Sequence, residues 1–172
     1  YKMKRYSVIW IGVATMLTVV LLSRFMATAS DGATHTLMNF SSNVIWNNLV
    51  LIYPATITLI AGYMIDRERT DDTLKNILTI PVSFRKLLVG KLVAVGCMAI
   101  VLSAVEFLFT IMIFLVSGFP GFTAAGAGKV LFQMIGINLS AYLAVMPVIA
   151  FTAQRRGSFM AGVGFTFFYG FV

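Results

Sequence analysis

Long apolar stretches alternate with short polar segments along this chain. About 20 consecutive apolar residues are enough for an α-helix to cross the hydrocarbon core of a lipid bilayer. Small and polar residues fill positions 25–43 and predict a loop, and the Ser-Gly-Phe-Pro-Gly sequence at 117–121 is typical of a turn. The pattern predicts spans at about 6–23, 44–65, 92–116 and 130–152, a truncated fifth span at 157–172, and a polar loop at 66–91.

The composition supports a membrane protein. Of the 172 residues, 59% are hydrophobic and 11% are charged, whereas soluble domains carry about 25% charged residues. A soluble fold of this length would expose large apolar patches, and the single Cys97 excludes an internal disulfide. We therefore expect an all-α, polytopic membrane helical bundle that forms a single transmembrane domain over 1–172. Because the chain begins at Tyr1 and ends within an apolar stretch, we expect it to be an internal part of a longer protein.

The positions of the basic residues predict the orientation of the spans. In a soluble protein, a net charge of +7 would suggest a nucleic-acid partner, but in membrane proteins basic residues mark the cytoplasmic loops. With a cytoplasmic N-terminus, two basic residues face outward (Arg24 and Lys129), and eleven face inward: Lys2, Lys4, Arg5, Arg67, Arg69, Lys75, Arg85, Lys86, Lys91, Arg155 and Arg156. This split supports that topology and argues against a nucleic-acid partner.

The polar loop between the second and third predicted spans has the pattern of a short surface helix. Thr70 can cap its start, and Leu74, Ile77 and Leu78 fall on one face. Pro81 disfavours helical geometry in the residue before it and so ends the helix. Such a helix either docks on a partner through its apolar face or simply joins two spans at the bilayer surface.

The residues of this loop resemble the cytoplasmic loop of ABC-2-type permeases. In that family, a Glu-Arg, Thr-Leu, Leu, Pro-Val-Ser and Gly-Lys pattern joins the second and third spans. The matching residues are Glu68, Arg69, Thr73, Leu74, Leu78, Pro81, Val82, Ser83, Lys86, Gly90 and Lys91.

The resemblance implies six spans in the bacterial cytoplasmic membrane and a coupling helix that docks on a separate ABC ATPase subunit. ATP and Mg would bind to that subunit, and this chain would pair with a second permease, either identical or different. The implied activity is export of a hydrophobic or amphipathic peptide, drug or lipid-like substrate, as in bacteriocin or lantibiotic immunity. The residues that would couple to the ATPase are Glu68, Arg69, Thr73, Leu74, Ile77, Leu78 and Pro81.

Three polar residues inside the predicted spans are candidates for a functional site. Glu106 lies near the middle of the third span, where a carboxyl group is costly. It can hydrogen-bond to Gln133 or Asn138 of the fourth span, or contact a cationic substrate. Two other functions stay open: a secondary transporter that is driven by an ion gradient and carries protons on Glu106, and a non-transporting sensor or scaffold.

Other chemistry has little support in the sequence. The glycines at 121–129 lack the Gly-Lys-Ser/Thr ending of a phosphate-binding loop, so we expect no cofactor in this chain. His35 is the single histidine, and we expect neither a metal site nor a catalytic site. Pro54 and Pro147 are expected to bend the second and fourth spans.

Overall fold

The computed structural model describes residues 4–29, 36–70, 84–152 and 163–166. These residues contain no strand, which agrees with the predicted all-α fold. In chain order the elements are α1 (Lys4–Ala29), α2 (Leu37–Asn47), the π-helical segment η1 (Asn48–Ile52), α3 (Tyr53–Thr70), α5 (Phe84–Val116) and α6 (Ala124–Thr152).

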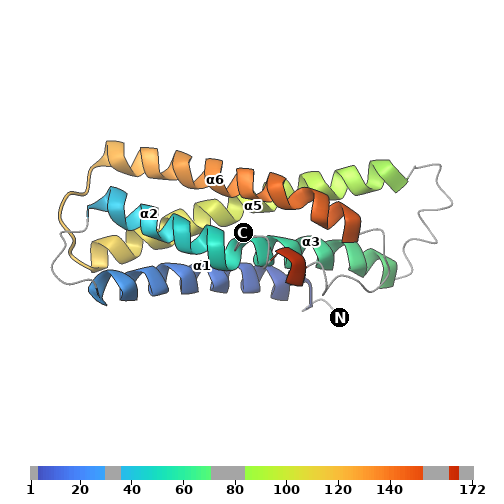
Figure 1. Cartoon of the computed structure of the whole chain (residues 1–172), viewed down its shortest axis with the longest axis horizontal. Helices are drawn as coiled ribbons and strands as arrows, with labels where there is room; N and C mark the ends of the chain where they lie inside the picture. Colours follow the sequence, from blue (N-terminus) through green and yellow to red (C-terminus); the bar gives the residue numbers. More distant parts are fainter. Residues whose placement is uncertain (1–3, 30–35, 71–83, 153–162, 167–172) are drawn as a thin grey trace.

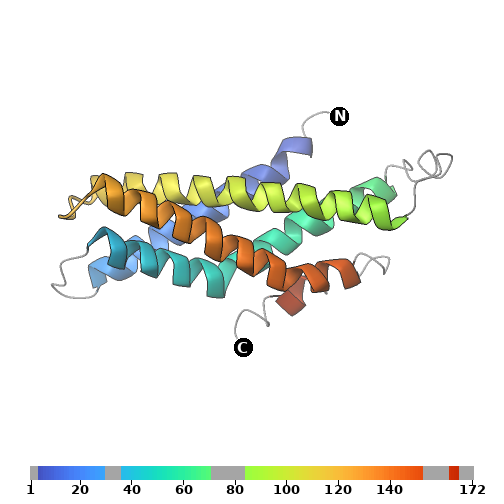
Figure 2. The same cartoon turned by 90° about the horizontal axis from the view of Figure 1, so that it is seen from above.

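The helices lie side by side in an elongated antiparallel bundle (Figures 1 and 2). α1 and α5 begin at one end of the bundle, where α3 and α6 finish, and we call this the inner end. At the opposite, outer end, α1 and α5 finish while α2 and α6 begin. This alternation is the up-and-down topology that the distribution of basic residues predicts.

Within the described ranges, three helices are each long and apolar enough to cross a membrane: Ile9–Ala29, Leu88–Val116 and Ala124–Phe151. A fourth crossing forms if the bent pair Leu37–Val50 and Tyr53–Met64 acts as one span. These helices correspond to the first four predicted spans. The fifth predicted span at 157–172 lies outside the described residues, except for 163–166.

One local prediction was wrong. The stretch 25–43 is not a single loop, because α1 continues to Ala29 and α2 begins at Leu37. The hydroxyl oxygen of Thr36 accepts a hydrogen bond from the backbone N–H of Asn39 at 3.4 Å, and this N-cap allows α2 to start within the polar sequence.

α3 reaches Thr70, and the helix that Thr70 is predicted to cap lies outside the described residues. The preceding residues, Asp66, Arg67, Glu68 and Arg69, include no Gly or Pro that would end the helix. α3 therefore continues past the apolar stretch. At the other side of the polar loop, α5 likewise begins at Phe84, ahead of the apolar stretch.

The predicted bend near Pro54 is confirmed. The two halves of the second crossing meet at 51°, and the π-helical segment η1 lies at their junction, where the N–H of Tyr53 binds the carbonyl oxygen of Asn48. Proline has no N–H to donate to the preceding turn, and the wider π-helical turn accommodates this defect. By contrast, α6 runs without interruption through Pro147.

Two apolar cores fill the bundle and follow one another along its long axis. The core toward the inner end includes Met16, Ile57, Leu102 and Val145, and the core toward the outer end includes Val19, Phe40, Phe114 and Met134. Many side chains on the outside are apolar as well; for example, Trp10 is 67% exposed and Phe132 is 79% exposed. An apolar exterior around a packed interior suits a protein surrounded by lipid.

Gly12 allows α1 to approach α5 closely. A Cβ atom at this position would lie 3.1 Å from Leu102 Cδ2 and 3.3 Å from Ile60 Cδ1. We expect Gly12→Val to lower the free energy of unfolding by about 1–3 kcal/mol, because overpacking forces side chains out of their preferred rotamers. Gly136→Val is the matched control, since nothing lies within 4 Å of a Cβ atom there. Equal thermal stability of the two variants in detergent would contradict this explanation.

Candidate functional site

The residues predicted to couple to an ATPase lie mostly outside the described part of the structure. Glu68 and Arg69 belong to the last turn of α3. Thr73, Leu74, Ile77, Leu78 and Pro81 are not among the described residues, so their role stays a prediction. The flanking helices are described: α3 finishes and α5 begins at the same, inner end of the bundle (Figure 1).

A second candidate site is a layer of buried polar side chains at mid-height of the bundle. Glu106 lies on α5 between Leu102 of the inner core and Phe114 of the outer core. Asn138 occupies the equivalent place on α6, and Asn48 lies where η1 begins. Glu106 and Asn48 are 0% exposed, and Asn138 is 3% exposed. We call Glu106, Asn138, Asn48 and Ser103 the polar layer.

Asn138 connects the members of the polar layer. Its Nδ2 donates to Glu106 Oε2 at 2.7 Å and to Ser103 Oγ at 3.0 Å. Its Oδ1 accepts from Asn48 Nδ2 at 3.5 Å. One amide thus joins α5, α6 and the bend of the second crossing, as polar side chains commonly do between membrane helices.

The hydroxyl group of Ser103 within the polar layer and that of Thr110 next to it both donate to backbone carbonyls. Ser103 Oγ donates to the carbonyl oxygen of Ala99 at 2.8 Å, and Thr110 Oγ1 donates to the carbonyl oxygen of Glu106 at 2.8 Å. Ser103 therefore offers only its lone pairs to Asn138. Neither hydroxyl hydrogen is available to the Glu106 carboxyl group.

Three buried polar atoms have no hydrogen-bond partner within the described structure: Glu106 Oε1, Asn48 Oδ1 and the hydroxyl of Tyr53. All three side chains are 0% exposed. Buried polar groups in native proteins are nearly always paired, so unpaired ones call for a physical explanation. Their presence at mid-height distinguishes this layer from ordinary contacts between helices.

Of the two partners predicted for Glu106, the structure brings Asn138 to it but not Gln133. The side chain of Gln133 is exposed on the outside of α6. Sequence reasoning did not single out Asn48, Ser103 or Tyr53. The sequence did contain a signal for Asn48, because its amide lies within the apolar stretch of the second predicted span. An amide in a membrane span is costly unless it packs against other polar groups.

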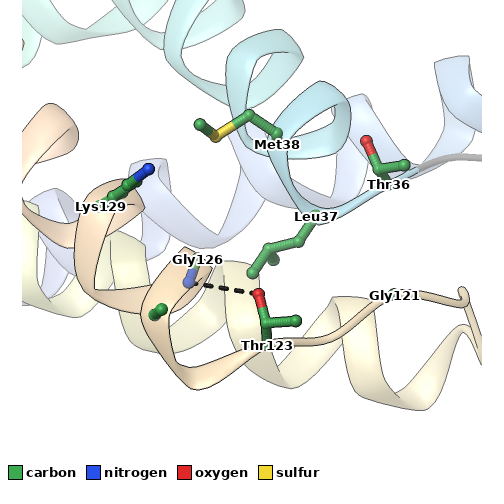
Figure 3. Close-up of a pocket in the computed structure, with 8 residues that line it drawn as sticks. Thr36, Leu37, Met38, Gly121, Thr123, Gly126 and Lys129 are labelled. Atoms are coloured by element: carbon green, nitrogen blue, oxygen red, sulfur yellow. Dashed lines mark hydrogen bonds between the residues drawn. The ribbon is translucent and has the colours of Figure 1, made fainter.

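A cavity of about 290 Å³ lies at the outer end, where α2 and α6 begin (Figure 3). Thr123 closes the start of α6, because its Oγ1 accepts from the N–H of Gly126 at 3.2 Å. A Cβ atom at position 126 would lie 2.7 Å from that oxygen, and Gly121 adopts a φ of 89°. The glycines of this segment thus serve the turn and the start of the helix. The cavity is lined by Gly121, Thr123 and Gly126 together with Thr36, Leu37, Met38, Ala125 and Lys129 (Figure 3).

The chain matches a family model and a related bacterial permease. A family model described as "ABC-2 family transporter protein" matches residues 1–172. A bacitracin transport permease protein (BCRB) of Bacillus licheniformis is 34% identical over 119 residues, which are 67% of this chain and 57% of that protein. The match therefore spans little more than half the length of this relative. No solved structure matches the chain significantly.

Proposed function

The chain belongs to the ABC-2 family of transporter proteins, and from this premise we propose that it is the permease subunit of an ATP-driven exporter. The match of the family model over the whole chain is the observation that carries the proposal. Together with the apolar helices, it makes the chain a multi-pass membrane protein of bacteria. The family also implies an ABC ATPase as a partner in the membrane setting.

We propose that ATP and Mg bind to that separate ATPase and that the segment between α3 and α5 transmits its motion. Both flanking helices reach the inner end of the bundle (Figure 1), and the distribution of basic residues supports a cytoplasmic location for this end. A force applied to the segment would act directly on α3 and α5. α5 carries Glu106 of the polar layer, and α3 begins with Tyr53.

We propose that the substrate passes between two permease bundles. The interior of this bundle is filled by large side chains, among them Tyr53, Phe40, Phe114 and Met16, all 0% exposed. A path for an amphipathic molecule therefore requires a second permease, identical or different. The name of the relative points to a peptide antibiotic, so an amphipathic peptide such as bacitracin is the first substrate to test.

The test is reconstitution of the full-length permease with the ATPase encoded beside it. We expect the two proteins to co-purify, and we expect inside-out vesicles to accumulate bacitracin only when Mg and ATP are both supplied. Accumulation driven by a proton or sodium gradient without ATP would instead establish a secondary transporter. Absence of both co-purification and bacitracin-stimulated ATP hydrolysis would favour a non-transporting sensor or scaffold.

A further inference from the structure

We propose that Glu106, Asn48 and Tyr53 form a site for one monovalent cation, either an alkali ion or a proton, at mid-height of the bundle. The three side chains come from α5, from η1 and from the start of α3. Each presents an oxygen that is buried and has no hydrogen-bond partner in the described structure. The site goes beyond the proposed transport function and does not depend on the ATPase.

The first argument is the uncompensated charge of Glu106. Its carboxyl group receives one hydrogen bond from a neutral amide, that of Asn138, and its Oε1 receives none. The Asn48 amide is the other hydrogen-bonding group that faces this carboxyl group. An ionised carboxylate that is fully removed from water needs a positive charge or a proton to neutralise it.

The described basic side chains near the core do not supply that charge. Lys91 on α5 donates to the carbonyl oxygen of Met64 on α3, at 3.2 Å and toward the inner end. Arg24 on α1 lies at the outer end, 4.8 Å from the centre of the Phe119 ring. Lys129 on α6 is exposed at the outer end.

Among the residues that the structure describes, the remaining titratable groups near the layer are phenols. Tyr53 lies close enough to Glu106 to interact with it electrostatically. The hydroxyl of Tyr142 on α6 donates to the carbonyl oxygen of Leu92 on α5 at 2.7 Å, within the inner core. A neutral phenol does not neutralise a carboxylate, although its oxygen can contact a cation.

The chemistry of the three oxygens identifies the class of ligand. A carboxylate oxygen, an amide oxygen and a hydroxyl are ligands for hard cations. Only one carboxyl group is present, and the described residues contain no group of three or more His, Cys, Asp and Glu side chains. A divalent ion would leave an excess positive charge in the apolar interior, whereas a single alkali ion or proton matches Glu106.

The bend of the second crossing explains how Asn48 reaches this place. Asn48 is the first residue of η1, and π-helical turns are frequent at functional sites. Broken membrane helices commonly bind ions at mid-height. A cation at this site would connect the bent second crossing to α5. It would be released when the second crossing and α5 move apart.

The thermal stability of the full-length permease in lipid nanodiscs tests this site. In one series NaCl or KCl replaces choline chloride at constant ionic strength, and in the other the pH rises from about 5 to 9 in choline chloride. For an alkali ion we expect the Tm to rise by about 3 °C for each tenfold increase in ion concentration above the Kd. For a proton we expect the Tm to fall by about 3 °C per pH unit above the pKa of an unfolded glutamate, about 4.3, because the folded state then holds one proton more than the unfolded state, and to level off once folded Glu106 loses its proton.

Two variants connect the response to the site. Glu106→Gln removes the charge and is expected to abolish whichever dependence the wild type shows, whereas the exposed Gln133→Leu should retain it. If Glu106→Gln does not fold, Tyr53→Phe removes one oxygen with little change in volume. In the Tyr53→Phe variant, the midpoint of the Tm response should shift to higher ion concentration in the salt series or to lower pH in the pH series. A wild type whose Tm responds to neither series, or a Glu106→Gln or Tyr53→Phe variant that responds like the wild type, would overturn the proposal.

Discussion

ATP-driven transport is expected to fall at least about tenfold when Leu74 and Leu78 are both replaced by Asp. The two leucines share the apolar face of the segment that we propose docks on the ATPase. An unpaired charge buried at an interface costs about 3–5 kcal/mol, and each 1.4 kcal/mol weakens binding about tenfold. Transport in proteoliposomes and co-purification of the ATPase measure the effect.

The matched control places the same two charges on the opposite face of the segment. In a helix, Asn76 and Thr79 point away from Leu74 and Leu78, so Asn76→Asp with Thr79→Asp should leave the complex and its transport largely intact. If the leucine variant still binds the ATPase and transports at the wild-type rate, this face is not the docking surface. The family assignment would stand in that case, because it rests on the whole chain.

Asn138→Leu is expected to lower the free energy of unfolding by about 1–3 kcal/mol. The substitution removes the donor to Glu106 Oε2 and Ser103 Oγ and the acceptor for Asn48. Buried polar groups left without partners cost about this much, and charged ones cost more. Thermal unfolding in nanodiscs measures the effect, with Gln133→Leu as a control on the exposed side of the same helix.

A double variant separates the cost of unpaired groups from the loss of packing. Replacing both partners of a buried hydrogen bond by apolar groups can be nearly neutral, so Glu106→Met should recover part of the stability that Asn138→Leu loses. Strictly additive effects of the two substitutions would show that the 2.7 Å contact between the two side chains does not couple them energetically.

The second crossing shows how far local sequence patterns extend. Pro54 predicted the bend because the missing N–H is a property of the residue itself. The helix that Thr70 is predicted to cap lies outside the described residues, and the described part of α3 continues as far as Thr70. Hydropathy predicted the end of the second span at residue 65 but not the continuation of α3 to Thr70. The end of α3 depends on where a helix breaker occurs, and none occurs between residues 65 and 70.

The polar layer could be predicted only in part. Glu106 and Asn138 attract attention because polar groups in apolar stretches are costly. Gln133 has the same signal yet is exposed, because five positions correspond to a rotation of about 140° around the helix axis. α6 is apolar on all sides, so the sequence contains no periodic pattern that tells which side faces α5.

The sequence by itself determined that this is a multi-pass helical membrane protein, and its basic residues predicted the orientation of the spans. These properties are sums over neighbouring residues, so they can be read along the chain. The tertiary structure decided that Asn138 rather than Gln133 meets Glu106, and that Asn48 and Tyr53 join them from a bent helix. That meeting depends on the rotation and contact of helices far apart in sequence, which packing alone fixes.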